Sequence, residues 1–330
     1  MSVGDPELRQ FLEAVRKLVA DHTDSGRLAG AAADAGKLRA ALDGADVTDL
    51  ALETHGMDTA GRWLSEVVRE VARECPSLGF VLAARYTAQR AIAELGGADG
   101  GREATTAFLD PLPGVPVEDE EPAGAAPFFF EPDSVLVLDS SSSDATLIRQ
   151  RAFEDLGDAP ARSGLADAKL RLVRVSDSTT PIDRAIASGL LRDWHILAGS
   201  VSIGIAERAL SAAESYAGER SQFGAKLTSF VGIRAMLAEM HIRLTGARAI
   251  LDQQIGAERD TADSATAAAV AGRAAVDIAL DAVQVHGGYG YIDEYPVARL
   301  VRDAVSMRAR SGSRRAAVAR IAEHRLGTFA

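Results

Sequence analysis

The feature that most constrains the fold of this sequence is a set of long apolar stripes in its second half. Between residues 230 and 251 the apolar side chains recur at alternating intervals of three and four, so they share one face of a helix. A second stripe runs over 190–205, an alanine-rich segment spans 265–285, and a last helix is expected over about 314–324. Helices with one apolar face pack those faces together, so residues 182–330 are predicted to form a four-helix bundle.

The apolar positions of these segments are expected to supply the core of the bundle. The first stripe consists of Phe230, Ile233, Leu237, Met240, Leu244, Ala247 and Leu251. The second stripe consists of Leu190, Trp194, Leu197, Val201 and Ile205. In the alanine-rich segment, Val276, Leu280 and Val283 lie on one face.

The first part of the chain, residues 1–112, is also predicted to be helical, and residues 113–181 are predicted to form a small β domain. Helical spacing follows Pro6, runs over 63–71, and resumes after Pro76 over about 78–95. A stretch rich in proline, glycine and acid over 111–127 is expected to be a loop. Short strands are expected at 128–130, 135–138, 145–148 and 170–175. The predicted fold class is mainly α with a small β domain.

Composition excludes several classes of function. The net charge is -11 and the pI is about 5.1, which argues against nucleic acid as a partner because phosphate binding needs a basic face. The single cysteine, Cys75, cannot form an internal disulfide and is expected to be a structural thiol. We expect neither a membrane span nor a signal peptide, because no long apolar run is present, and we expect a cytoplasmic protein.

Three motifs in the second half carry the functional signal. They are YAGERSQFG at 216–224, QVHGGYGY at 284–291 and EYPVARLVRD at 294–303. Taken singly, each has a structural explanation: Gly224 as a helix C-cap, the glycines after 286 as a tight turn, and Arg302 and Asp303 as exposed ions. The glycine cluster lacks the Lys-Ser/Thr ending of a P-loop, and it follows a helix, unlike a Rossmann fingerprint.

Taken together, the order and spacing of the three motifs closely resemble the C-terminal domain of the acyl-CoA dehydrogenase family. The resemblance covers about residues 185–330. The N-terminal half is similar only in layout, with helices followed by a small β segment. The resemblance implies the fold of that family: an N-terminal α domain, a β-barrel, here reduced, and a C-terminal four-helix bundle.

The same resemblance implies a cofactor, FAD, bound across a subunit interface. In the family, the arginine and phenylalanine of the first motif hold the pyrophosphate and adenine side of FAD, and the QxxGG turn meets the same flavin. An arginine can make charge-assisted, often bidentate bonds to a diphosphate, and glycines let backbone N–H groups approach phosphates. The residues implied here are Arg220, Gln222, Phe223, Gln284, Gly287 and Gly288.

The sequence departs from the family where the catalytic base is expected. The family removes an α-proton from an acyl-CoA and passes the β-hydrogen to flavin as hydride, so the protein must supply a carboxylate. In most members that glutamate precedes a Gly-Thr, and here Ser311 occupies its place. The alternative position of the base, aligned on Gly204, falls at Trp194, so no catalytic residue is assigned. Its neighbours Asp193 and His195 are candidates for an atypical base, and a buried structural role is favoured for His195.

The middle segment departs as well, because the family's usual flavin-ring motifs are absent and residues 113–180 contain no tryptophan. The chain therefore resembles the non-catalytic subunit of heteromeric α2β2 acyl-CoA dehydrogenases of actinobacterial steroid degradation. This implies a partner subunit carrying the catalytic glutamate, an acyl-CoA substrate, with a steroid side-chain CoA as one candidate, and an electron-transfer flavoprotein as acceptor. The alternatives are a self-sufficient homo-oligomeric dehydrogenase with an atypical base and a flavin-free scaffold.

Overall fold

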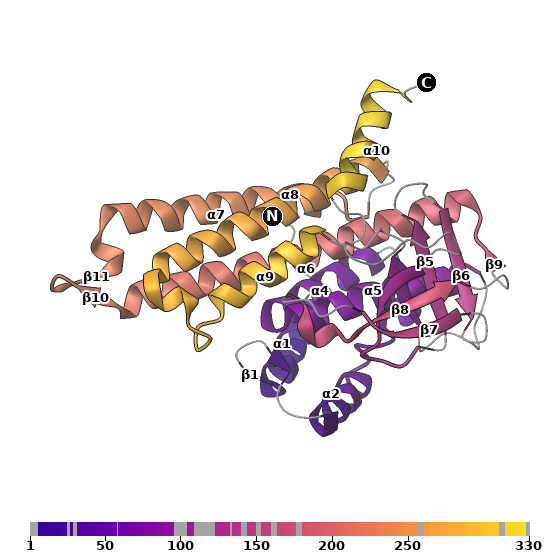
Figure 1. Ribbon diagram of the computed structural model, residues 1–330, viewed down its shortest axis with the longest axis horizontal. Helices are drawn as coiled ribbons and strands as arrows, with labels where there is room; N and C mark the ends of the chain where they lie inside the picture. Colours follow the sequence, from indigo (N-terminus) through magenta and orange to yellow (C-terminus); the bar gives the residue numbers. More distant parts are fainter. Residues whose placement is uncertain are drawn as a thin grey trace.

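The computed structural model describes thirteen stretches of the chain, and all structural statements below concern these residues. They are residues 6–24, 27–28, 32–57, 59–95, 104–108, 123–132, 134–139, 144–149, 153–159, 164–175, 180–256, 261–309 and 314–327. The molecule has three parts, which Figure 1 shows: an N-terminal group of helices, a β-sheet beside it, and a long helical bundle that extends away from both.

The N-terminal part is helical, as the sequence predicts. Pro76 occupies the first turn of its longest helix, where the missing N–H costs nothing, and it separates that helix from the preceding one. The helices are α1 (Pro6–Asp21), α2 (Ala32–Gly44), α3 (Leu50–Glu53), α4 (Ala60–Glu74) and α5 (Pro76–Glu94), with a short hairpin of β1 (Thr23–Asp24) and β2 (Arg27–Leu28). Cys75 lies between α4 and α5 and is fully buried, and burial raises the pKa of its thiol to about 12.

The β part is one seven-stranded sheet in the order β7-β8-β4-β3-β5-β6-β9. All neighbouring strands run antiparallel except β3 and β5, which run parallel. The strands are β3 (Ala104–Phe108), β4 (Ala123–Pro127), β5 (Ser134–Asp139), β6 (Asp144–Arg149), β7 (Phe153–Asp158), β8 (Leu170–Val175) and β9 (Thr180–Pro181), with a 3-10 turn, η2 (Ala166–Ala168), before β8.

Three of the four predicted strands are confirmed as β5, β6 and β8, and one prediction is wrong. Residues 128–130 follow β4 instead of forming a strand, because their phenylalanines turn into the core, where the rings of Phe129 and Phe130 pack edge to face at 4.9 Å. The expected loop over 111–127 ends in a strand, since 123–127 pairs with β8 along its whole length. Strand β3 lies within the range assigned to the helical part, yet it pairs with β4 and β5.

The C-terminal part is a bundle built on one very long helix, α6. Its elements are α6 (Arg184–Glu219), β10 (Ser221–Gln222), β11 (Ala225–Lys226), η3 (Leu227–Ser229), α7 (Val231–Asp252), α8 (Thr261–His286), η4 (Gly287–Tyr291), α9 (Val297–Ala309) and α10 (Arg314–Leu326). The second stripe, on α6, is buried at every position. By length and composition α6 would also suit a membrane span, but 72% of its most apolar window is buried inside the molecule, which is typical of a core helix.

The bundle differs from its prediction in three respects. The fourth helix is α9, which packs against α6 and α8, whereas α10 packs against α8 and projects from the bundle (Figure 1). Leu280, predicted to share the inner face of α8, is 50% exposed, while Val276 on the same helix is buried. The first stripe is confirmed on α7 only as an inner edge: Met240, Ala247 and Leu251 are buried, and most of the helix surface faces outward.

The bundle meets the N-terminal helices through close backbone contact. Gly204 of α6 faces α4 so closely that a Cβ placed there would lie 2.5 Å from the carbonyl oxygen of Arg69. Only a residue without a side chain permits this approach, so Gly204 fixes the crossing point of α4 and α6. The hydroxyl groups of Ser65 and Ser200 meet at 2.7 Å across the same contact.

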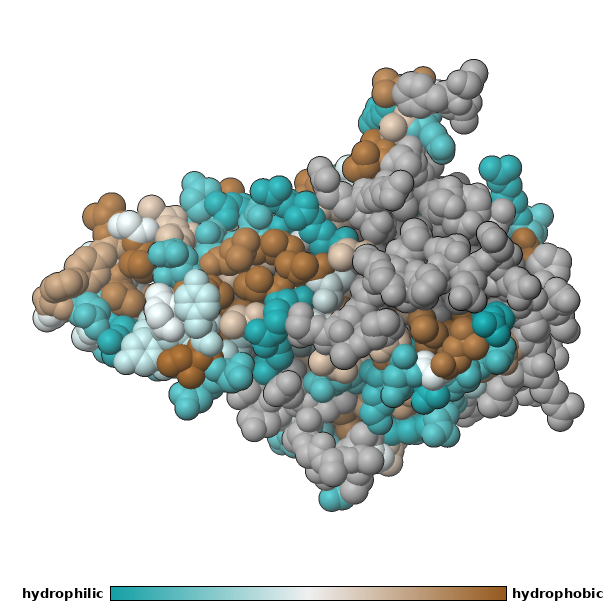
Figure 2. All heavy atoms as spheres, viewed as in Figure 1, coloured by the Kyte–Doolittle hydropathy of each residue, from teal (hydrophilic) through white to brown (hydrophobic). Residues whose placement is uncertain are grey.

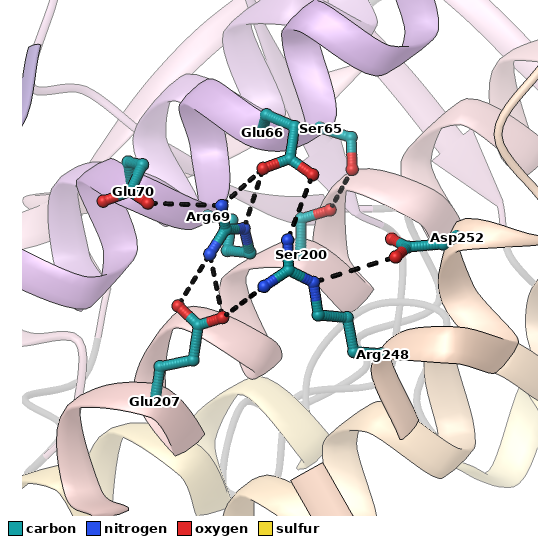
Figure 3. Close-up of polar contacts among 8 residues, drawn as sticks. All are labelled: Ser65, Glu66, Arg69, Glu70, Ser200, Glu207, Arg248 and Asp252. Atoms are coloured by element: carbon teal, nitrogen blue, oxygen red, sulfur yellow. Dashed lines mark hydrogen bonds and ion pairs between the residues drawn. The ribbon is translucent and has the colours of Figure 1, made fainter. Parts of the chain in front are cut away.

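Beside that crossing lies a cluster of charged residues from α4, α6 and α7, shown in Figure 3. Arg69 donates two hydrogen bonds of 2.8 Å to the carboxylate of Glu207, and it also contacts Glu66 and Glu70. Arg248 of α7 adds contacts to Glu207 at 3.2 Å and to Glu66 at 3.5 Å. The three helices are therefore joined by charge pairing at one point, which we call the α4–α6–α7 charge cluster.

Candidate cofactor-binding surface at the end of the bundle

The first motif forms the connection between α6 and α7. Helix α6 ends at Glu219 because Arg220 adopts an extended conformation, although its N–H still donates to the Tyr216 carbonyl oxygen at 2.9 Å. The chain then makes the β10–β11 hairpin, with Phe223 and Gly224 at its tip at φ angles of +52° and +80°. Gly224 is thus a hairpin-turn residue, and its interpretation as a helix C-cap is wrong.

The second motif forms the connection between α8 and α9. Helix α8 ends at His286, and Gly287 begins the 3-10 turn η4 with a φ angle of +59°. Gln284, Gly287 and Gly288 are all exposed. The prediction of a tight turn with positive φ at the glycines is therefore confirmed at Gly287, and the turn presents Gly287 and Gly288 to the outside.

The two motifs are far apart in sequence but meet on one surface of this chain. The guanidinium carbon of Arg220 lies 5.0 Å from the ring centroid of Tyr289, which follows the two glycines of the second motif. Gln222, with its amide oxygen turned toward the guanidinium, accepts from Nε of Arg220 at 3.2 Å and from Nη2 at 2.7 Å. We call this region, residues 216–224 with 284–291, the motif surface.

A stack of aromatic rings lies beneath the motif surface. The rings of Tyr216 and His286 stack with centroids 4.2 Å apart, and Tyr295 meets both edge-on at 5.6 Å and 5.4 Å. Tyr289 packs edge-on against Tyr295 at 6.1 Å. Nδ1 of His286 donates to the Ala282 carbonyl oxygen at 2.7 Å, and burial lowers the pKa of His286. His286 is therefore a neutral, structural member of the stack at neutral pH.

The surroundings of the motif surface are unusually apolar for an exterior. Phe223 at the hairpin tip is 96% exposed, and Val231 at the start of α7 is 82% exposed. Ile242 on the same helix and Tyr291 in η4 are also exposed. Figure 2 shows apolar atoms gathered over the bundle half of the molecule. Exposed apolar area of this kind, with polar residues around it, marks an interaction surface more often than a solvated face.

The positions considered for a catalytic base lie elsewhere, and the three that the structure describes are buried or paired. Trp194 is 1% exposed and packs edge to face against Phe80 of α5 at 6.1 Å. Asp193 forms an ion pair with Arg90 of α5, with 2.7 Å between Oδ2 and Nε. Burial raises the pKa of Asp193, although the guanidinium of Arg90 opposes the shift. His195 is buried, with Nδ1 3.1 Å from the hydroxyl of Ser264 on α8, the structural role that the sequence favours. Ser311 lies outside the described residues.

The third motif contains a buried carboxylate that sequence reasoning misplaced. Asp303 on α9 is 3% exposed rather than a surface ion, and its Oδ1 accepts from the backbone N–H of Leu165 at 2.6 Å. Burial raises the pKa of Asp303 to about 6. Asp303 therefore ties the loop before β8 to the bundle. Its position on the helix face shared with Leu300 and Met307 is the signal that could have indicated burial.

The motif surface fits the adenosine-diphosphate half of FAD. A half-buried guanidinium, exposed glycine backbone and an exposed phenylalanine are the groups that bind a diphosphate and stack on an adenine. Of the predicted cofactor residues, Arg220 and Gln222 are in contact with each other, Phe223 lies at the adjoining hairpin tip, and Gln284, Gly287 and Gly288 lie on the adjoining turn. Sequence reasoning missed Tyr289, which joins the two groups.

Comparison with known proteins finds a family that matches most of the second half of the chain. Residues 186–326 match the family described as acyl-CoA dehydrogenase, C-terminal domain. The chain is 39% identical over 123 residues to a short-chain-specific acyl-CoA dehydrogenase of Megasphaera elsdenii, a match covering 36% of this chain and 32% of that protein. It is 33% identical over 196 residues to a 3-sulfinopropanoyl-CoA desulfinase of Paraburkholderia xenovorans, covering 57% of this chain and 48% of that protein. The chain thus spans less than half the length of these curated relatives.

Solved structures extend the similarity to the whole chain. Butyryl-CoA dehydrogenase from Megasphaera elsdenii superposes with a TM-score of 0.74 at 20% identity, covering 98% of this chain and 99% of the other. A variant of a steroid ACAD superposes with a TM-score of 0.75 at 20% identity, covering 96% and 97%. The chain therefore has the acyl-CoA dehydrogenase fold. Its residues 186–326 match the C-terminal domain of the acyl-CoA dehydrogenase family, whose members depend on FAD.

Proposed function

We propose that this chain is a subunit of a heteromeric FAD-dependent acyl-CoA dehydrogenase that contributes the interface half of the FAD site. In this proposal a second acyl-CoA dehydrogenase chain supplies the catalytic glutamate in an α2β2 complex. The observation that carries the proposal is a contrast within one chain. The motif surface is assembled and open, with Arg220 beside Tyr289, whereas Trp194, at one base position, is closed into the core.

The residues of this chain have binding and positioning roles in the proposal. Bound FAD would accept the β-hydrogen of the acyl thioester as hydride. Arg220 would bind the diphosphate, the backbone at Gly287 and Gly288 would approach it closely, and Phe223 would pack on the adenine side. Removal of the α-proton needs a carboxylate near the substrate. Asp193 is held by Arg90, so the base is assigned to the partner.

The partner is proposed to cover the apolar exterior of the bundle. Val231 and Ile242 of α7 are more than half exposed, and burying such side chains against a second bundle stabilises an assembly by about 1.5–3 kcal/mol each when burial is complete. A finer proposal is that the substrate is a steroid side-chain CoA. The similarity of the fold to that of a steroid ACAD supports it. An electron-transfer flavoprotein is proposed as the acceptor from family resemblance.

The test is expression of the chain alone and together with a neighbouring acyl-CoA dehydrogenase gene that retains the glutamate. We expect little flavin in the single chain, and a yellow complex of two chains of each kind with two flavins that oxidises acyl-CoA. A stable yellow homotetramer of this chain, active on acyl-CoA, would overturn the proposal and favour the homo-oligomeric alternative. Absence of flavin from both preparations would favour a scaffold.

Variants of the complex separate binding from catalysis. Arg220→Ala and Gln284→Ala are expected to lower flavin occupancy, measured by the ratio of flavin to protein absorbance, because both remove a polar group of the motif surface. Ser311→Ala is the matched control and is expected to change turnover little. If Ser311→Ala abolished turnover, the assignment of the base to the partner would be wrong.

A further inference from the structure

Tyr289 joins the two halves of the motif surface on its exposed side, where its ring meets Arg220. Its ring lies 5.0 Å from the guanidinium carbon of Arg220, which is within the range of a cation–π contact. It belongs to η4, directly after the exposed Gly288. Tyr289 is 43% exposed, so it is part of the surface rather than of the core.

The contacts of Arg220 leave much of its binding capacity unused. A guanidinium has five N–H groups, and Gln222 engages two of them. Tyr289 lies on its face and takes no N–H. Across the described residues, the remaining three N–H groups have no other partner in this chain. Arg220 is therefore oriented by its neighbours and still able to donate to an anion.

The ring of Tyr289 is itself supported from below. It packs edge-on against Tyr295, and Tyr295 packs against the stacked pair of Tyr216 and His286. Tyr216 lies one helical turn before Arg220, and its carbonyl oxygen accepts the backbone N–H of Arg220. The stack therefore contacts both Tyr289 and the backbone of Arg220. An arginine held on both sides loses little rotamer freedom when it binds, and that raises affinity.

We propose that Tyr289 is a positioning residue that holds the guanidinium of Arg220 ready for the diphosphate of FAD, with the Tyr216–His286–Tyr295 stack fixing the ring of Tyr289. This inference rests on the proposed function, since it assumes that FAD binds the motif surface. It goes beyond the proposed function because it assigns part of the affinity for FAD to residues that do not contact the diphosphate.

The experiment measures the Kd for FAD in the two-chain complex, after removal of flavin, from the quenching of FAD fluorescence on binding. Tyr289→Leu keeps apolar bulk but removes the aromatic face, and we expect the Kd to rise about three- to tenfold. Tyr289→Phe keeps the face and is expected to stay within about twofold of the wild type. The matched control is Val305→Ala, which removes an exposed apolar side chain of α9 that lies outside the motif surface.

A double-mutant cycle distinguishes positioning from direct contact. In the Arg220→Ala background, Tyr289→Leu is expected to have almost no further effect, because the group that it orients is gone. An unchanged penalty in that background, a wild-type Kd for Tyr289→Leu, or a Kd for Tyr289→Phe as weak as for Tyr289→Leu would each overturn the proposal.

Two further outcomes separate this inference from the proposed function. If Arg220→Ala weakens FAD binding and Tyr289→Leu does not, only the positioning role fails. If the wild-type complex binds no FAD, both fail. Melting temperatures of all variants check folding. Hydrogen exchange of the Arg220 Nε–H in the chain alone, expected to be faster in Tyr289→Leu than in the wild type, tests positioning without any flavin.

Discussion

Two arginines of this molecule have different surroundings and different expected roles. Arg69 lies in the α4–α6–α7 charge cluster, and Arg220 lies in the motif surface. Arg69 in the cluster has a side chain that is 11% exposed and meets three carboxylates of its own chain. Burial lowers the pKa of Arg69, but Glu207, Glu66 and Glu70 outweigh that effect and the net shift is upward. Arg220 has one amide and one aromatic face as partners.

The comparison teaches that charge satisfied within the chain serves the fold, and charge left open serves a ligand or a partner. The cluster joins the N-terminal helices to the bundle, so its loss should be seen in stability. The exposed groups of the motif surface, Arg220 among them, contribute little to packing, so their loss should be seen in binding.

Replacement of Arg69 by methionine is expected to lower the free energy of unfolding by about 3–5 kcal/mol. It would leave the buried carboxylate of Glu70 without its ion pair, and Glu66 and Glu207 with only the more exposed Arg248. Urea denaturation followed by circular dichroism measures the change. The matched control is Arg248→Met in the same cluster, where the side chain is 39% exposed, and the loss is expected to be about 1 kcal/mol or less. Equal losses in both variants would break the comparison.

The buried carboxyl group of Asp303 is expected to make the stability of the protein depend on pH. Burial raises the pKa of Asp303 to about 6, above the unfolded value of about 3.9. The folded state therefore binds this proton more tightly than the unfolded state. Asp303 contributes stability that is fully present below about pH 4 and is lost as the pH rises through about 6.

Asp303→Asn removes this titration but keeps an oxygen to accept from Leu165. Relative to the variant, the wild type is expected to lose roughly 3 kcal/mol at most between pH 4 and pH 7. Denaturation at a series of pH values measures the difference. Parallel curves for the two proteins would show that Asp303 does not titrate in this range.

Two glycines of η4, Gly290 and Gly288, are expected to differ in their importance for stability. A Cβ at Gly290 would lie 2.8 Å from the backbone oxygen of Val283, so Gly290→Ala is expected to cost about 1–3 kcal/mol of stability. At Gly288 nothing lies within 4 Å of such a Cβ, and Gly288→Ala is expected to change stability by less than about 0.5 kcal/mol.

Flavin binding, unlike stability, is expected to depend on Gly288. Gly288→Ala in the complex is expected to lower flavin occupancy, since the added methyl group would lie where the backbone is proposed to approach the diphosphate. Thermal denaturation and flavin absorbance together measure both effects. A variant with full flavin occupancy would place the cofactor away from this turn.

The bundle could be predicted from sequence because its signal is local. Apolar residues at helical spacing reveal α6 and α8 without any knowledge of their neighbours. The strands were harder, because β3 and β7 lack a clear apolar alternation and are defined by pairing with strands distant in sequence. Which of α9 and α10 completes the bundle also depends on contacts with distant segments, so their periodicity did not reveal it.

The sequence by itself determined the helical segments, the three motifs and the residues that can bind a diphosphate. Tertiary structure decided which of these residues meet, because the contact of Arg220 with Tyr289 depends on how α6 and α8 end at the same place. It also decided that Asp303 is buried and that Asp193 is paired, since burial and pairing are properties of neighbours. Sequence names the charged groups, and packing decides which of them remain open to a ligand.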